Sequence, residues 1–316
     1  MFDRSKIRNW LGVVASIGAF VCAESLGVAR AGDAPIRPLP PADWFHVVRL
    51  DDRTYELSEP KYWQGNVSYL LLGRRAAFLF DTGPGLYSIR SVVQTLTHLP
   101  LIVIPSHLHF DHVGDLAEFS DVRLLDTPPL REELHNGELV ETPNQLLLKS
   151  GIRYRVAGWI KDGESIDFGE RTVTLLSTPG HTPDSVSILD AGGKRLFTGD
   201  LIGHGVTLVD VPGSDLHEMS GTLHRLLRIA PNAELAYEAH SEKPFTRTEL
   251  QQFAAGVDEI ASGRAQWKSS CLGGVAMKQF IVAGYPVLLS AVPGQDLQPL
   301  NSSTETLDWL GSACTR

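Results

Sequence analysis

The residues best suited to chemistry lie in one short stretch of the chain, from position 106 to position 112. Two histidines separated by one residue point to the same side of an extended segment, so they can bind one metal ion, and the aspartate and histidine that follow can face a second. The apolar run 101–104 reads as a buried strand, which places these residues in a loop at the strand's carboxyl end. The four residues are His107, His109, Asp111 and His112.

A purely structural role for these four residues is the competing interpretation. A single histidine in a folded chain is more often an ordinary surface or core residue than a ligand. Four polar residues without a ligand, however, would compete for hydrogen bonds within one short loop. The clustering therefore favours a metal site.

Further polar motifs follow other short apolar runs. Each run reads as a strand, so each motif falls where a strand ends and a loop begins. These motifs are Asp81-Thr82-Gly83 after 76–80, Pro179-Gly180-His181-Thr182 after 172–176, Thr198-Gly199-Asp200 after 195–197, and His240 after 234–237. Asp81 can cap the helix expected over 86–97, and its carboxylate can also orient the histidines of the metal loop.

Taken together, these motifs resemble the metallo-β-lactamase fold superfamily of metal-dependent hydrolases, over about Thr54 to Ser262. The resemblance implies an α/β fold, a four-layer αββα sandwich of two related halves. Each half is a sheet covered by helices, with the metals at the shared edge. The similar short sequences at 79–83 and 196–200 are consistent with two such halves.

The resemblance also implies a ligand set for two zinc ions. The first ion is expected on His107, His109 and His181, and the second on Asp111, His112 and His240, with Asp200 bridging them. Three nitrogen ligands leave an open position on the first ion, as catalytic sites require. Two ions that share a water supply hydroxide near neutral pH, and Asp111 would orient it for attack on a carbonyl.

The identity of Asp200 bears on the substrate. By resemblance, β-lactam hydrolases have cysteine or serine at this place, whereas lactonases and glyoxalase-type thioesterases carry the aspartate. We therefore expect a small-molecule acyl substrate with an ester, thioester or lactone carbonyl. A class B-type β-lactamase, a mononuclear iron dioxygenase of the same fold and a non-catalytic metal carrier are the alternatives.

Three residues outside the ligand set are candidates for contact with the substrate. His204 follows Asp200 by four positions, and it is either an acid or oxyanion donor or a surface histidine. Tyr62 and Trp63 lie in the loop 59–65, where they either plug a sheet edge or overhang the site as substrate contacts.

The amino terminus has the pattern of a secretory signal peptide. Basic residues precede an apolar run over 10–23, and Ala29-Arg30-Ala31 suits a signal peptidase. The run is shorter than the roughly 20 residues of a membrane span, although an anchor left in place is the alternative. We expect a periplasmic or secreted protein without stable membrane insertion after cleavage.

Net charge argues against a nucleic-acid partner. The chain carries a formal charge of −9 at pH 7, and without a basic stripe it gains no affinity from counterion release. The short stretch between Asp200 and His240 also leaves no room for the extra domain that nucleic-acid-cleaving members of the family insert there. The oligomeric state is not determined by the sequence.

These patterns divide the chain into four parts. We expect a signal peptide over 1–31, an extended lead-in over 32–53, the catalytic domain over 54–262 and a C-terminal extension packed on it over 263–316. Within the domain, 138–161 shows no sustained periodicity and is interpreted as a variable insertion near the site.

The C-terminal extension contains two of the three cysteines, Cys271 and Cys314. In an exported chain the simplest interpretation is a disulfide between them, and two free thiols are the alternative. Closing a loop of this length would contribute roughly 4 kcal/mol in the chain-entropy model.

Overall fold

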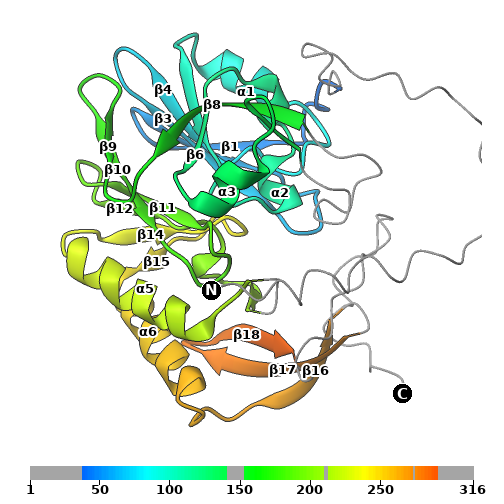
Figure 1. The fold of residues 1–316 in the computed structure, drawn as a ribbon, viewed down its shortest axis with the longest axis vertical. Helices are drawn as coiled ribbons and strands as arrows, with labels where there is room; N and C mark the ends of the chain where they lie inside the picture. The colour runs from blue at the N-terminus through cyan, green and yellow to red at the C-terminus, as the bar shows by residue number, and fades with distance from the viewer. Residues whose placement is uncertain (1–37, 141–152, 210–212, 273–274, 291–316) are drawn as a thin grey trace, which may run out of the picture. The chain divides into compact units, whose positions relative to one another are not determined.

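The apolar runs of the first half of the chain form one large sheet (Figure 1). The computed structural model describes residues 38–140, 153–209, 213–272 and 275–290. In sheet order, the strands are β1 (His46–Asp51), β2 (Thr54–Ser58), β3 (Val67–Leu72), β4 (Ala77–Phe80), β5 (Leu101–Ile104), β6 (Val122–Leu125), β8 (Arg153–Ile160) and β7 (Glu138–Val140). The strands β4, β5, β6 and β8 run parallel to one another, so the loops after β4 and β5 leave the sheet at the same edge.

A second sheet is built from the following part of the chain. Its strands, in sheet order, are β15 (Phe245–Thr246), β14 (Leu235–Tyr237), β12 (Arg195–Phe197), β11 (Val186–Asp190), β10 (Thr172–Ser177) and β9 (Ser165–Asp167). Strands β10, β12 and β14 each end just before one of the polar motifs. The second sheet therefore delivers the remaining site residues to a common edge.

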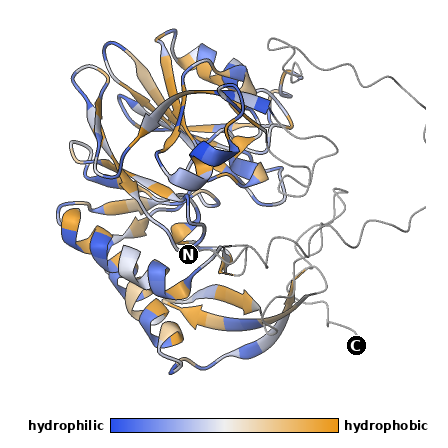
Figure 2. Cartoon of the chain, viewed as in Figure 1, coloured by the Kyte–Doolittle hydropathy of each residue, from blue (hydrophilic) through white to orange (hydrophobic). Residues whose placement is uncertain are grey.

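Alternating side chains bury both faces of each sheet. In β4, Phe78 and Phe80 face the core between the two sheets, whereas Leu79 faces the helical layer. In β12, Phe197 faces the core between the sheets and Leu196 packs in the outer core with α5 and α6. Figure 2 shows hydrophobic residues concentrated along these strands. The predicted four-layer αββα sandwich is confirmed.

The helices cover the outer faces of the two sheets. Helices α1 (Ile89–Leu96), α2 (Phe110–Val113) and α3 (Pro128–Glu133) belong to the first half, and α5 (Leu216–Ile229) and α6 (Arg247–Ala261) to the second. The expected capping box of α6 is present, because Thr246 and Glu249 each accept a hydrogen bond from the other's backbone N–H. Helix α1 is capped by Ser88, so Asp81 does not have the capping role considered for it.

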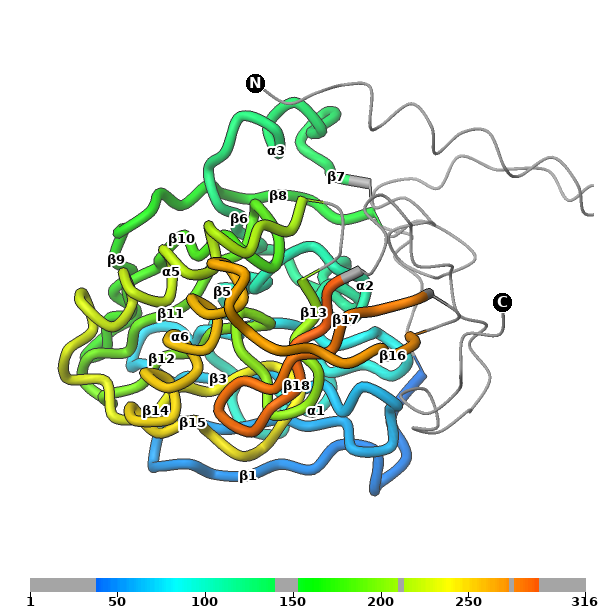
Figure 3. The backbone as a smooth tube through the Cα atoms, turned by 90° about the horizontal axis from the view of Figure 1, so that it is seen from below, coloured from blue at the N-terminus to red at the C-terminus, as the bar shows by residue number. Residues whose placement is uncertain are grey.

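A third sheet lies beyond the expected catalytic domain. It contains β13 (Thr207–Leu208), β18 (Tyr285–Ser290), β17 (Val275–Val282) and β16 (Lys268–Leu272), in that order. Strands β16, β17 and β18 come from the C-terminal extension, and β13 comes from the segment after Asp200 (Figure 3). The extension thus contributes a sheet that pairs with the catalytic domain.

The structure differs from the sequence-based expectation in two segments, the lead-in and the insertion, which contribute β1, β7 and β8 to the first sheet. Strand β1 pairs with β2, so the sheet begins inside the segment expected to be a lead-in. Strand β8 lies in the segment expected to be an insertion, where Tyr154 and Val156 alternate with exposed residues and pair the strand with β6. The alternation is interrupted at Gly158 and Trp159, which are both half-buried.

Some predictions concern residues outside the described part of the chain. The signal peptide over 1–31, residues 141–152 and Cys314 are among them. Cys271 is buried in β16, and its disulfide with Cys314 stays a prediction. Within the described residues, no helix combines the length and the apolar character that a membrane crossing requires.

Candidate metal centre

The loop after β5 brings its histidines to the edge where the two sheets meet. His107 and His109 lie before α2, and the single turn of α2 carries Asp111 and His112. His107 Nε2 lies 2.8 Å from His109 Nδ1, and the ring of His181 from the loop after β10 brings its Nε2 to 3.1 Å from the same atom. These three residues are called the first ligand group.

A second ligand group forms from the other half of the same loop. It consists of Asp111, His112 and His240. Asp111 Oδ2 lies 3.4 Å from His112 Nε2 and 3.5 Å from His240 Nε2. Asp111 and His112 come from α2 in the loop after β5, and His240 comes from the loop after β14, so the two loops meet at this group.

Asp200 lies between the two groups. One of its carboxylate oxygens is 3.1 Å from His240 Nε2, and the other is 3.6 Å from His181 Nε2. His112 Nε2 is also within 3.4 Å of Asp200. The structure therefore brings together all seven side chains that the sequence predicts as ligands, with Asp200 between the two groups.

The chemistry of these donors fits metal ions. His112 Nε2 and Asp200 Oδ1 are buried and have no hydrogen-bond partner among the described residues. Buried polar atoms without partners are costly, so the arrangement indicates a bound group that would satisfy them. Within each ligand group the donor atoms lie within 4.8 Å of one another, as coordination to a shared ion requires.

Electrostatics favour the metal-binding protonation state at some of these residues and oppose it at two. Burial lowers the pKa of His107, and it lowers the pKa of His109 to about 3, so both imidazoles are neutral. Burial opposes ionisation of Asp200, but His240 and His112 beside it hold the pKa of Asp200 well below its usual range. Neutral imidazole and ionised carboxylate are the forms that coordinate metals. Burial opposes protonation of His112 and His240, but the carboxylates of Asp111 and Asp200 raise the pKa of His112, and Asp200 raises the pKa of His240 to about 9, so a bound metal ion would displace a proton from each.

The remaining ring nitrogens of four histidines each have a partner that orients the ring. These pairs are His107 Nδ1 with Ser106 Oγ at 3.0 Å, His112 Nδ1 with Asp81 Oδ2 at 3.0 Å, His181 Nδ1 with the Leu208 carbonyl at 2.8 Å and His240 Nδ1 with the Gln64 carbonyl at 3.2 Å. An N–H held on Nδ1 leaves the Nε2 lone pair for a metal. The orienting role expected for Asp81 is confirmed.

Asp111 is held by two amides that the sequence interpretation did not identify. Gln64 Nε2 donates to Asp111 Oδ2 at 2.9 Å, and Asn66 Nδ2 donates to the same oxygen at 3.1 Å. Gln64 belongs to the loop 59–65, in which the sequence singled out only the aromatic residues as candidates for the site. Its position directly after Tyr62 and Trp63 is the one feature of the sequence that could have indicated a role for Gln64.

Comparison with known proteins agrees with this geometry. A sequence model of the metallo-beta-lactamase superfamily matches residues 62–240, which is more than half of the chain. The chain belongs to this superfamily. The match ends at His240, the last histidine of the second ligand group.

Relatives within the superfamily include two named hydrolases. The chain is 27% identical over 216 residues to the human acyl-coenzyme A thioesterase MBLAC2, covering 59% of this chain and 77% of that protein. It is 27% identical over 252 residues to the hydroxyacylglutathione hydrolase of Hahella chejuensis, covering 73% and 86% respectively. The chain is thus a hydrolase of the metallo-beta-lactamase superfamily.

Solved structures support the fold assignment. A metallo-beta-lactamase from Pontibacter korlensis superposes with a TM-score of 0.52 at 17% identity, covering 68% of this chain and 99% of that one. At this identity the similarity establishes the superfamily fold alone.

The aromatic residues of the loop before β3 differ in their surroundings. Trp63 is 43% exposed, whereas Tyr62 is half-buried. Burial, and then the negative charge of Asp111, raises the pKa of Tyr62, which places its hydroxyl within the field of the second ligand group. Tyr62 is therefore the better candidate of the two for contact with a substrate, and that contact stays a prediction.

His204 contacts the site through another residue. Glu238 Oε1 accepts hydrogen bonds from His204 Nδ1 at 3.1 Å and from the His204 backbone N–H at 2.5 Å. The other oxygen of Glu238 accepts the backbone N–H of His240 at 3.1 Å. The ring of His204 packs against Phe245 and Tyr285, so the predicted acid or oxyanion role stays a prediction.

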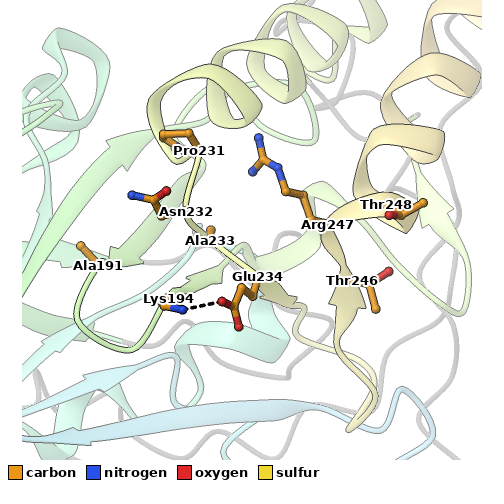
Figure 4. Close-up of a pocket in the computed structure, with 9 residues that line it drawn as sticks. All are labelled: Ala191, Lys194, Pro231, Asn232, Ala233, Glu234, Thr246, Arg247 and Thr248. Carbon is orange, nitrogen blue, oxygen red and sulfur yellow. Dashed lines mark hydrogen bonds and ion pairs between the residues drawn. The ribbon is translucent and has the colours of Figure 1, made fainter.

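A surface hollow of about 590 Å³ lies near the start of α6 and is separate from the ligand groups (Figure 4). Both basic side chains that line it already have partners within the chain. Lys194 pairs with Glu234 at 2.5 Å, and Arg247 donates hydrogen bonds to the carbonyls of Leu227 and Ala230. No residue of either ligand group lines this hollow. It contributes nothing to the metal centre.

Proposed function

We propose that the chain is an exported hydrolase that holds two zinc ions and cleaves an ester, thioester or lactone carbonyl. The observation that carries the proposal is the place of Asp200, whose two oxygens lie 3.1 Å from His240 and 3.6 Å from His181. One carboxylate in contact with both ligand groups is the arrangement that joins two ions into one centre.

The residues around this centre have distinct roles in the proposed reaction. Bound zinc ions lower the pKa of water and polarise a carbonyl oxygen. Burial keeps His107 and His109 neutral, and His107, His112, His181 and His240 are each oriented by a partner on the far ring nitrogen. Asp111 is fixed by Gln64 and Asn66, so its carboxylate keeps one orientation toward the reacting water.

The charge of Asp200 supports the proposed substrate class. A carboxylate between the ligand groups adds negative charge where a leaving group would be stabilised. An amide nitrogen that leaves as an anion depends on that stabilisation, whereas an alkoxide or thiolate leaves more readily. The two named relatives, an acyl-coenzyme A thioesterase and a hydroxyacylglutathione hydrolase, agree with an acyl substrate.

Metal content and substrate preference test the proposal together. Elemental analysis of the purified mature protein should find two zinc ions per chain, whereas one equivalent of iron would contradict the zinc centre. The protein is then assayed for kcat/KM on thioesters, lactones, esters, penicillins and carbapenems. The acyl class is wrong if any β-lactam is cleaved with a higher kcat/KM than every other substrate.

A variant of Asp200 isolates the charge argument. Asp200→Ser removes the negative charge and should raise the ratio of β-lactam to ester cleavage. A matched control is His224→Ala, because His224 is an exposed histidine of α5 that pairs with Asp258 of α6, away from the ligand groups. An unchanged ratio in Asp200→Ser would show that pocket shape, and not charge, decides the substrate.

Export is the part of the proposal that rests on the sequence alone. The basic start, the apolar run and the Ala-x-Ala site predict a mature chain that begins near Gly32. Mass spectrometry of periplasmic or secreted protein measures the starting residue. A chain that retains Met1 in the soluble exported fraction would contradict export by cleavage.

A further inference from the structure

Strand β13 has one neighbour in the third sheet. It consists of Thr207 and Leu208, which pair in parallel with Val287 and Leu288 of β18. The backbone N–H of the next residue, Val209, donates to the Leu288 carbonyl at 3.0 Å. A strand of two residues is not stable by itself, so its position depends on β18.

The same short strand orients a residue of the first ligand group. His181 Nδ1 donates to the Leu208 carbonyl at 2.8 Å. On the other side of the ring, His181 Nε2 lies 3.1 Å from His109 Nδ1. A shift of the Leu208 carbonyl would therefore turn the ring and move Nε2 away from its partners in the group.

Two further hydrogen bonds of the segment around His181 fix its main chain and do not hold the ring. Ser214 Oγ donates to the His181 carbonyl at 2.9 Å, and the Asp215 N–H donates to the Gly180 carbonyl at 2.9 Å. Neither bond reaches the imidazole. The hydrogen bond to Leu208 is the one that selects which ring nitrogen carries the proton.

The third sheet is a firm support for β13. Leu288 and Met277 are buried together, with Leu208 and Val206 packed against them. At the other end of the hairpin, a Cβ added to Gly256 of α6 would lie 2.4 Å from Val282 Cγ1, so helix and sheet are in close contact. This support comes from residues beyond position 240, where the match to the superfamily ends.

We infer that β18 is a positioning element for the metal centre: by holding β13, it keeps the Leu208 carbonyl on His181 Nδ1 and so completes the first ligand group. This assigns a role to the C-terminal extension. The inference rests on the metal centre of the proposed function, although the hydrogen bond itself exists without a metal.

Two variants weaken the link between β18 and β13. Val209→Pro removes the N–H that donates to Leu288, and because a residue before proline prefers an extended backbone, Leu208 can keep its conformation. Leu288→Ala removes the side chain that packs beneath Leu208. The matched control is Val282→Ala, which removes buried methyl groups from the same sheet where it faces α6.

Zinc affinity is measured by competition with a chelator, and urea unfolding shows that each variant is folded. Both test variants should bind the ion of the first ligand group about 10- to 100-fold more weakly, with the second group less affected. Val282→Ala should lose stability but keep both affinities. If Val209→Pro does not fold, Leu288→Ala decides the question.

A second measurement needs no metal. In metal-free protein labelled with ¹⁵N, the imidazole of His181 should carry its proton on Nδ1, and both test variants should lose this single tautomer. Unchanged tautomer and affinity in both variants, or an equal loss in Val282→Ala, would overturn the inference. If the wild-type protein binds no zinc, the proposed function fails, and the tautomer measurement still decides the role of β18.

Discussion

Replacing Asp81 by asparagine should weaken the second ligand group and spare the first. Asp81 is buried and accepts two hydrogen bonds, from the Ser106 backbone N–H at 2.5 Å and from His112 Nδ1 at 3.0 Å. Asparagine has nearly the same shape but one acceptor oxygen. If that oxygen keeps the bond to Ser106, the amide NH₂ group faces the N–H of His112.

The size of the effect follows from this single lost bond. A hydrogen bond to a charged group contributes about 1.5–3 kcal/mol net. At about 1.4 kcal/mol for each tenfold change, the second ion should bind roughly 10- to 100-fold more weakly. If His112 instead accepts from the amide, its proton moves to Nε2, and that nitrogen can no longer coordinate.

The assay is zinc binding in competition with a chelator, with both dissociation constants determined. Asp184→Asn is a matched control, because Asp184 Oδ2 accepts the backbone N–H of Leu108 in the same loop at 3.0 Å and no imidazole proton. The control should keep both affinities. The reasoning is refuted if Asp81→Asn binds the second ion as tightly as the wild type, or loses both ions equally.

Three further predictions concern other parts of the chain. His181→Ala should abolish turnover and lower zinc content, whereas His204→Ala should keep its zinc, and elemental analysis that finds full zinc in His181→Ala would show that the first group is misassigned. Burial raises the pKa of Glu59 from 4.5 to about 8, so the folded state binds this proton more tightly than the unfolded state does. The free energy of unfolding should therefore decrease as the pH rises from about 4.5 to about 8, by at most about 5 kcal/mol. Urea unfolding of Glu59→Gln should show a flatter pH profile over that window, and an identical slope would contradict the assignment. Alkylation of unreduced, denatured mature protein should label neither Cys271 nor Cys314, and two reactive thiols would exclude their disulfide.

Much of the catalytic framework was predictable because its signals are local. The apolar run 101–104 forms β5 with the expected bounds, and the capping box at Thr246 and Glu249 opens α6. Histidines separated by one residue after a strand converge because the backbone between them is short. The ligand motifs could therefore be recognised one at a time, each from a few neighbouring residues.

Tertiary structure decided the parts that depend on partners distant in the chain. Strand β8 alternates weakly and becomes a strand because it pairs with β6, and β13 is held by β18 from the C-terminal extension. Main-chain carbonyls such as those of Leu208 and Gln64 orient His181 and His240, yet a carbonyl is present at every residue and leaves no mark in the sequence. The sequence by itself determined which side chains can bind metal, and only the folded chain determined which atoms hold them in the orientation that binding requires.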